Sequence, residues 1–366
     1  MSKVGIITFH AAHNYGSNLQ AYAMQKIIDS FGIENEIINF RTDRQKDQYR
    51  PFTNRKGLKY IIKNGYFFFN YSWRKKKYLK FEKFIDEKLK KTAKEYKSLD
   101  ELYVANLDYE YYISGSDQIW NTVPVDADMA YFLPFVKKGI KIAYAPSFGQ
   151  IGNIKNKKEI AEYLNEYKYL SIREKYGQKL IKSMINKCVP VLMDPTILIK
   201  KEEWENMISD RIIEDDYIFF YTLFATKEMI NIVKIISKET GLKVVISNIS
   251  NQYEIFSGFE KKLESGPMEF LNYIKYAKLV CSSSFHGTVF SILLNKPFYS
   301  INGMRDNRIS TLLEMTNLTK RAITLNDVKN GLNDIFNLNF VYAEKSIEQE
   351  KQKAIKYLKE ALDIEE

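Results

Sequence analysis

The chain has 366 residues, of which 45% are apolar and 27% charged, a balance typical of a folded protein with a sizeable core. This composition excludes disordered, collagen-like and low-complexity proteins, and the length predicts about two domains. The two cysteines exclude a disulfide scaffold and fit a reducing compartment, and three histidines are too few for a histidine-rich metal site. The start of the chain does not resemble a signal peptide, and no segment is apolar enough to span a membrane, so we expect a soluble cytoplasmic protein.

The net charge of +10 is concentrated in one stretch, residues 41–97, which has 19 basic and 6 acidic residues. Its centre joins aromatic to basic side chains: Tyr66, Phe67, Phe68, Phe69, Tyr71, Trp73, Arg74, Lys75, Lys76 and Lys77. Rings beside cations suit contact with an anionic membrane. The alternative is a solvated lysine-rich helix with an ordinary core stripe of Tyr78, Phe81 and Ile85. The sequence shows no nucleic-acid-binding module, so no nucleic-acid partner is expected.

In chain order, the first half alternates short apolar strands with helical segments. The expected strands are residues 3–9, 36–40, 109–113, 140–145 and 169–172. After the first strand, apolar residues at helical spacing predict a helix that starts near Ser17 or Asn18, either of which would be its N-cap, and stops at Gly32. Such alternation predicts a mostly parallel sheet.

The second half repeats the pattern with a new set of strands and helices. The expected strands are 217–223, 243–247, 278–281 and 297–301, and the expected helices are 226–239, 267–276 and 287–295. We therefore predict an α/β protein of two Rossmann-like, doubly wound domains, residues 1–190 and 191–345, followed by a helix over 346–366 that packs back on the first domain. Ligands of such folds bind at the carboxyl ends of the strands.

The first candidate motif follows the first strand and contains Asn14, Tyr15 and Gly16. A polar loop that leads into a helix can present backbone N–H groups to an anion. The alternative is an ordinary capped loop, because the glycine patterns of dinucleotide and P-loop sites are absent. His10 and His13 lack the helical spacing of a metal pair.

The second motif, Ser114 to Asn121, follows the strand at 109–113. Its candidate binding residues are Ser116, Asp117, Gln118, Trp120 and Asn121. Their polar groups can hydrogen-bond a polar ligand, and Trp120 can either stack on a sugar ring or fill the core.

The third motif, Ser171 to Glu174, places Arg173 at a strand end. A guanidinium there can bind a carboxylate or phosphate with two parallel hydrogen bonds. The alternative is a structural salt bridge to Glu174 or another acid.

The fourth motif is a serine run that leads into a helix near His286. Hydroxyls and free N–H groups of Ser283, Ser284, Gly287 and Thr288 converge where the imidazole projects. An imidazole at a helix start is placed for proton transfer, and a buried structural histidine is the alternative.

These motifs together resemble the polysaccharide pyruvyl transferase family. The resemblance spans about residues 4–321. It rests on six short sequence motifs: Asn14-Tyr15-Gly16, Ser114 to Asn121, Ser171 to Glu174, Asp194-Pro195-Thr196, Ser284 to Thr288, and Asn307-Arg308-Ile309. It implies two domains that face a cleft, as in GT-B glycosyltransferases. It also implies transfer of pyruvate from phosphoenolpyruvate onto two hydroxyls of one sugar, which forms a cyclic ketal and releases phosphate.

The resemblance assigns roles to the candidate residues. Arg173 and His286 handle the donor, with His286 as general acid. The remaining donor-binding residues are Ser283, Ser284, Gly287, Thr288 and Arg308. The acceptor-binding residues are Asn14, Tyr15, Gly16, Ser116, Asp117, Gln118, Trp120 and Asn121. No metal or organic cofactor is implied.

The expected partners are phosphoenolpyruvate and a sugar or lipid-linked oligosaccharide, used in making a surface polysaccharide such as a capsule or exopolysaccharide. A lipid-linked acceptor would bring the enzyme to the inner face of the plasma membrane, as a peripheral protein on anionic lipid. Two alternatives stay open: a GT-B glycosyltransferase that uses a nucleotide sugar, and a non-catalytic glycan-binding protein.

Overall fold

The computed structural model of the chain describes residues 3–52, 57, 65, 71–124, 126–149, 154 and 156–364. These form two compact units: Met1–Ile199 together with Glu350–Glu366, and Lys200–Gln349. The division falls nine residues later than the expected boundary at 190/191. The reason is that the chain after 190 still bonds to the first unit, through a bridge between Ile172 and Val191 and an ion pair between Arg173 and Asp194.

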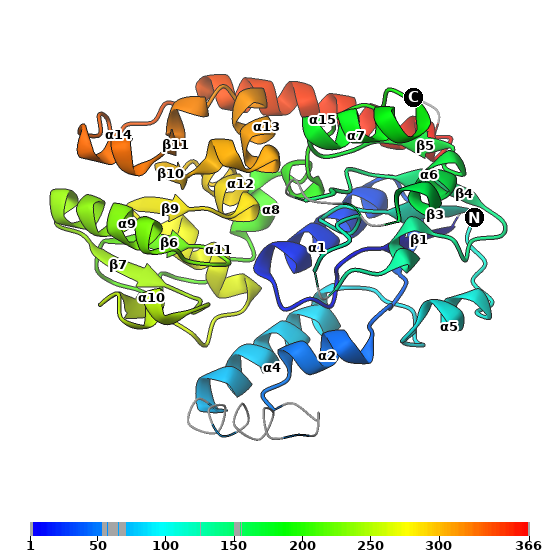
Figure 1. Cartoon of the computed structure of the whole chain (residues 1–366), viewed down its shortest axis with the longest axis horizontal. Helices are drawn as coiled ribbons and strands as arrows, with labels where there is room; N and C mark the ends of the chain where they lie inside the picture. Colours follow the sequence, from blue (N-terminus) through cyan, green and yellow to red (C-terminus); the bar gives the residue numbers. More distant parts are fainter. Residues whose placement is uncertain are drawn as a thin grey trace. The chain divides into compact units, whose positions relative to one another are not determined.

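The first unit is built on a parallel sheet in the order β2-β1-β3-β4-β5 (Figure 1). Its strands are β1 (Lys3–Ile7), β2 (Glu34–Ile37), β3 (Tyr111–Ser114), β4 (Ile140–Ala143) and β5 (Tyr169–Leu170). Every neighbouring pair is parallel, so the carboxyl ends of all these strands lie at one edge. The strands predicted from the apolar runs are therefore confirmed.

Helices of the first unit connect these strands. They are α1 (Tyr15–Ser30), α2 (Asp43–Tyr49), α4 (Tyr71–Lys88), α5 (Leu99–Tyr103), α6 (Lys157–Asn165) and α7 (Lys175–Ile185), with 3₁₀ turns η1 (Met129–Phe132) and η2 (Pro195–Ile197). The N-cap prediction for α1 was wrong. Asn14 is the cap, and its Oδ1 accepts from the N–H groups of Gly16 and Ser17 at 3.0 and 3.4 Å. The hydroxyl of Ser17 instead donates to Asp117.

The basic helix α4 packs one apolar face into the first unit. Phe81, Phe84 and Ile85 are buried, and the Phe81 ring stacks on His13 with centroids 4.9 Å apart. His13 Nε2 also lies 2.6 Å from Glu82. The core-stripe interpretation of this helix is thus confirmed for Phe81 and Ile85. The aromatic residues 66–69 of the predicted membrane segment lie outside the described residues.

The second unit contains a parallel sheet in the order β11-β10-β9-β6-β7-β8. Its strands are β6 (Tyr217–Tyr221), β7 (Lys243–Ile246), β8 (Glu260–Lys261), β9 (Leu279–Ser282), β10 (Phe298–Ile301) and β11 (Ala322–Ile323). Strands β8 and β11 were not predicted, because each is a two-residue edge strand, too short for an alternating pattern to show.

Helices cover both faces of the second sheet. They are α8 (Lys201–Glu205), α9 (Lys227–Thr240), α10 (Gln252–Ile255), α11 (Pro267–Tyr276), α12 (Phe285–Leu293), α13 (Asn307–Met315) and α14 (Leu325–Lys329), with turns η3 (Gly303–Arg305) and η4 (Thr319–Arg321). Because side chains alternate along β6, Ile218 and Phe220 join a core with α9 and α14. Phe219 and Tyr221 point to the other face and contact Phe270 of α11.

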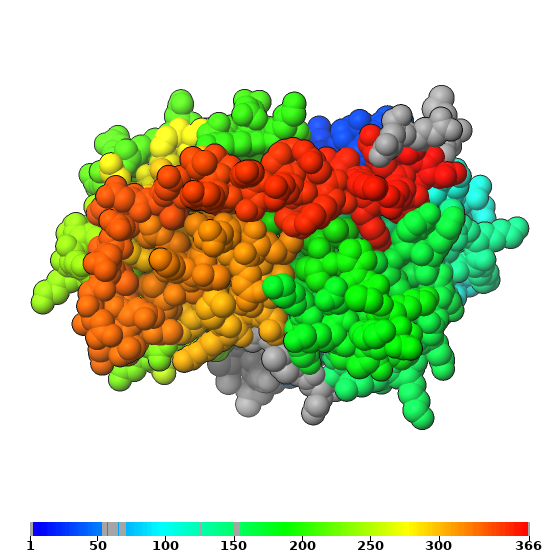
Figure 2. Space-filling model, turned by 90° about the horizontal axis from the view of Figure 1, so that it is seen from above, coloured from blue at the N-terminus to red at the C-terminus, as the bar shows by residue number. Residues whose placement is uncertain are grey.

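The last helix, α15 (Val341–Ala361), begins in the second unit, and its residues from Glu350 onward belong to the first. The Tyr357 hydroxyl donates to the carbonyl of Ala143 at the end of β4, at 2.9 Å. Figure 2 shows this red stretch at the surface, against green segments of the first unit. The prediction of a C-terminal helix that packs back on the first domain is confirmed.

None of the helices in the described part of the chain has the length and apolar character needed to cross a bilayer.

A buried histidine makes stability depend on pH. Burial lowers the pKa of His10 to about 4, whereas an unfolded histidine titrates near pH 6.5. The unfolded chain therefore gains a proton first, so this stability is complete above pH 6.5 and is lost as the pH falls towards 4. We expect the unfolding free energy from denaturant titration to fall by on the order of 1 kcal/mol per pH unit in this window. If the unfolding free energy of a His10→Gln variant depended on pH in the same way, the attribution of this dependence to His10 would be wrong.

Candidate active site

A sharp turn after β3 brings the second sequence motif to the carboxyl edge of the first sheet. Gly115 has a φ of +134°, and a Cβ built there would lie 2.1 Å from the carbonyl oxygen of Tyr144. Only glycine fits this close approach of two strands. The turn places Ser116 and Asp117 directly beyond the strand end, where both are buried.

A buried polar network joins the other motifs of the first unit to this turn. The Arg173 guanidinium donates to Asp194 Oδ2 at 2.8 Å and lies 3.6 Å from Asp117 Oδ1. Ser17 Oγ donates to Asp117 Oδ2 at 2.5 Å. The same aspartate, Asp194, accepts from the N–H and hydroxyl of Thr196. Four segments that are distant in sequence thus meet at one sheet edge.

The environment of Arg173 is that of a structural ion pair. Its side chain is 1% exposed, and that of Asp194 is fully buried. The described geometry matches the salt-bridge alternative, with Asp117 and Asp194 as acidic partners of Arg173. A direct donor contact by Arg173 stays a prediction.

Of the predicted acceptor residues, Asn14, Gln118 and Asn121 are partly accessible. Asn121 Nδ2 donates to Gln118 Oε1 at 3.3 Å, so the two amides form one polar surface. Gly149 closes over them, since a Cβ there would lie 2.4 Å from Asn121 Nδ2. These amides are the side chains of the motif best placed to meet a sugar hydroxyl.

The expectation that Trp120 contacts the acceptor is corrected by its burial. Its side chain has no exposed area and stacks on Phe132 with centroids 5.3 Å apart. Its Nε1 donates to the carbonyl of Tyr131. Trp120 therefore fills the core, and Tyr15 and Gly16 are likewise buried as part of α1.

In the second unit, the serine run forms the turn between β9 and α12. Gly287 allows the helix to lie against the strand, because a Cβ there would be 2.2 Å from Ser282 Oγ. The Ser283 hydroxyl lies 2.7 Å from the Thr222 hydroxyl at the end of β6. Thr288 is buried, and its hydroxyl donates to the carbonyl of Ser284 at 3.1 Å. Ser283 and Ser284 therefore lie at the carboxyl edge, whereas Thr288 supports the turn.

His286 lies in the first turn of α12, as the sequence predicted. It is 6% exposed, and its ring meets that of Phe285 edge to face at 5.2 Å. The N–H groups of a helix start, together with the helix dipole, favour a negatively charged ligand beside this imidazole.

Arg308 follows β10 at the same edge and belongs to the first turn of α13. Its guanidinium binds the N-cap residue Asp306 with two hydrogen bonds, from Nε at 2.9 Å and from Nη2 at 2.5 Å. Sequence analysis did not single out Arg305. It is an exposed cation on η3 that forms no ion pair with any described residue. Its position three residues before Arg308 was the signal that could have found it.

The predicted site residues therefore form one group in each unit. Arg173 and the predicted acceptor residues belong to the first unit, and His286 and Arg308 belong to the second. Sequence reasoning gave Ser17 only the role of a helix cap and gave Asp194 no role in the site, although both complete the network around Asp117. Among the described residues no group of histidine, cysteine, aspartate and glutamate is arranged to hold a metal ion.

Comparison with known proteins identifies related sequences and folds. A family model described as polysaccharide pyruvyl transferase matches residues 14–303. No curated protein matches the chain. The S. aureus MnaA–UDP co-structure is similar over 100% of this chain and 98% of its own, with a TM-score of 0.54 and 12% identity. A putative UDP-N-acetylglucosamine 2-epimerase from Listeria monocytogenes also has a TM-score of 0.54, at 10% identity, over 96% of this chain and 91% of its own. These likenesses show a GT-B-like fold and, at such low identity, nothing more.

Proposed function

This chain belongs to the polysaccharide pyruvyl transferase family, and we propose that it transfers pyruvate from phosphoenolpyruvate onto two hydroxyls of one sugar in a polysaccharide precursor. The observation that carries the proposal is the placement of His286. The imidazole lies in the first turn of α12, beside Ser283 and Ser284, at the edge where Arg305 and Arg308 follow β10. An acid, N–H donors and cations at one place suit a small, multiply charged donor.

In the proposed reaction, protonated His286 gives its proton to the methylene carbon of phosphoenolpyruvate. This leaves an oxocarbenium-like centre on the neighbouring carbon, which the first sugar hydroxyl attacks with loss of its proton. The bond from that carbon to the phosphate oxygen then breaks. The second hydroxyl attacks the same carbon, loses its proton, and closes the cyclic ketal. No metal or organic cofactor enters this scheme.

The roles in acceptor binding follow from accessibility. Asn14, Gln118 and Asn121 are partly exposed at the carboxyl edge of the first sheet, so we assign them to the sugar. The buried Asp117 positions this surface through Ser17 and Arg173.

The direct test is incubation with phosphoenolpyruvate and candidate acceptors, including lipid-linked oligosaccharides, with mass spectrometry of the products. A pyruvate ketal and inorganic phosphate in equal amounts are expected. Release of a nucleotide from a nucleotide sugar would instead support a glycosyltransferase, which the fold alone does not exclude. Glycan binding without either reaction would support a binding protein.

We further propose that the exposed face of α4 holds the enzyme on the cytoplasmic leaflet, where a lipid-linked acceptor would be found. Lys75 and Lys76 are exposed, opposite the buried Phe81 and Phe84. Cations on the outer face of a helix that is anchored by its inner face are available to anionic lipid.

Vesicle sedimentation with anionic lipid at low and high salt tests this placement. Each cation near the surface contributes on the order of 1 kcal/mol, so Lys75→Gln with Lys76→Gln should weaken binding by about tenfold or more. The matched control is Lys353→Gln with Lys356→Gln, which removes the same charge from exposed positions on α15. Equal vesicle binding by both double variants, or vesicle binding that does not depend on salt, would contradict the proposed contact of α4 with the membrane.

A further inference from the structure

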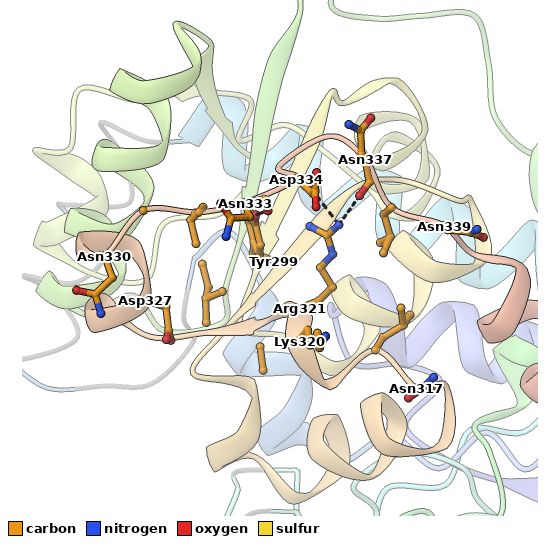
Figure 3. Close-up of a pocket in the computed structure, with 16 residues that line it drawn as sticks. Tyr299, Asn317, Lys320, Arg321, Asp327, Asn330, Asn333, Asp334, Asn337 and Asn339 are labelled. Atoms are coloured by element: carbon orange, nitrogen blue, oxygen red, sulfur yellow. Dashed lines mark hydrogen bonds between the residues drawn. The ribbon is translucent and has the colours of Figure 1, made fainter.

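A hollow of about 830 Å³ lies within the second unit, away from the residues assigned to transfer. Its walls are η4, β11 and residues 330–339 (Figure 3). Its volume is within the range of about 300–1,000 Å³ that is usual for ligand sites. Turn η4 precedes β11, whereas His286 and Arg308 follow β9 and β10, and these three strands are parallel. The hollow is therefore at the opposite edge of the sheet from His286.

A buried arginine holds the walls of this hollow together. Arg321 Nη2 donates to the carbonyls of Asp334 and Asn337 at 3.2 and 2.9 Å, as Figure 3 shows. Its guanidinium also lies 5.3 Å from the centre of the Tyr299 ring on β10. Because the loop over 330–339 is tied to the sheet in this way, the hollow is formed before any ligand binds.

Asparagine amides are the dominant polar groups around the hollow. Asn317, Asn330, Asn333 and Asn337 all line it, and all are exposed. Within the described part of the chain, none of these four side chains has a hydrogen-bond partner. Each amide offers both donors and an acceptor, and a sugar hydroxyl also both donates and accepts.

The charge of the lining indicates a neutral ligand. Lys320 and Arg321 are balanced by Asp327 and Asp334, although the chain as a whole has a net charge of +10. A polyanion site needs an excess of cations, which this lining does not have. Apolar side chains complete the walls and suit the C–H faces of sugar rings: Leu318, Ala322, Ile323, Leu332 and Leu338.

We propose that this hollow is a carbohydrate site that binds a stretch of neutral oligosaccharide. Its identification with part of the acceptor glycan rests on the proposed function, whereas binding itself does not. A second binding site for a polymer, at a distance from the point of transfer, raises the effective concentration of the acceptor at the transfer site.

The experiment is calorimetric titration of the full chain with neutral tetrasaccharides: maltotetraose, cellotetraose, mannotetraose and chitotetraose. Saturable binding of at least one of them is expected. Asn333→Ala with Asn337→Ala should weaken it by about five- to thirtyfold, because each amide contributes a hydrogen bond. Asn330→Ala alone should weaken it by a smaller factor. Asn326→Ala is the matched control, since it is an exposed asparagine on α14 that does not line the hollow.

Three results would overturn the proposal. They are the absence of binding to all four neutral sugars, equal binding by the double variant and the Asn326→Ala control, and tighter binding of a heparin-derived tetrasaccharide. Thermal unfolding of each variant confirms that the fold is retained. The titrations contain no phosphoenolpyruvate and no transfer step, so their failure leaves the proposed reaction standing, and failure of the transfer assay leaves the titrations unaffected.

Discussion

Replacing His286 with alanine or glutamine is expected to lower turnover by about two to four orders of magnitude, the usual contribution of a positioned general acid. Without the imidazole, the methylene carbon of the donor must take its proton from water. Acceptor affinity should change much less, because the assigned acceptor residues belong to the other unit. The measurement is the rate of phosphate release from phosphoenolpyruvate at saturating acceptor.

A matched control for His286 lies on the same helix. Ser291 is fully buried, and its hydroxyl donates to the carbonyl of Gly287 at 2.7 Å. Ser291→Ala therefore disturbs α12 without touching the proposed donor, and turnover within a few-fold of the unaltered enzyme is expected. If His286→Gln kept near-normal turnover, His286 would not be the general acid, and its role would be structural.

Replacing Arg173 with alanine is expected to destabilise the protein by about 3–5 kcal/mol, because it leaves Asp194 and Asp117 as buried carboxylates without their cation. Denaturant unfolding measures this loss. Lys353→Ala is the matched control: its ion pair with Glu350 involves a side chain that is 65% exposed, so a change within about 1 kcal/mol is expected. If Arg173→Ala changed the free energy of unfolding only slightly, the ion pairs of Arg173 with Asp194 and Asp117 would not be maintained in solution.

The structural role of Arg173 must be separated from the predicted donor contact. Arg173→Ala and Arg173→Lys should both weaken phosphoenolpyruvate binding if the planar guanidinium meets the donor, since a lysine does not reproduce its geometry. A double variant, Arg173→Gln with Asp194→Asn, removes both charges of the closest pair and should regain part of the lost stability. If donor affinity returns together with stability, Arg173 is a positioning residue. If affinity stays low in the stable double variant, the arginine binds the donor.

The α/β class, the main strands and the positions of the motifs at the strand ends could all be predicted from the amino-acid sequence. Apolar runs such as 217–223 and 278–281 are visible because fully buried parallel strands need apolar side chains on both faces. His286 could be placed at a helix start from the serine run and the apolar helix after it, since these are local signals. The family resemblance also rests on strings of neighbouring residues, and the match over residues 14–303 confirms it.

Which of these residues contact one another could not be predicted from the sequence, because it depends on how distant segments pack together. Arg173, Asp117 and Asp194 lie in separate segments of the chain, and nothing in their local sequence says that the arginine pairs with both of these acids. Trp120 is a second case, because a tryptophan in a polar motif looks the same whether it faces a sugar or fills the core. The hollow beside β11 is a third, since it depends on Arg321 bonding to carbonyls 13 and 16 residues further along the chain. Burial and ion pairing are set by long-range packing, which propensity and local pattern do not encode.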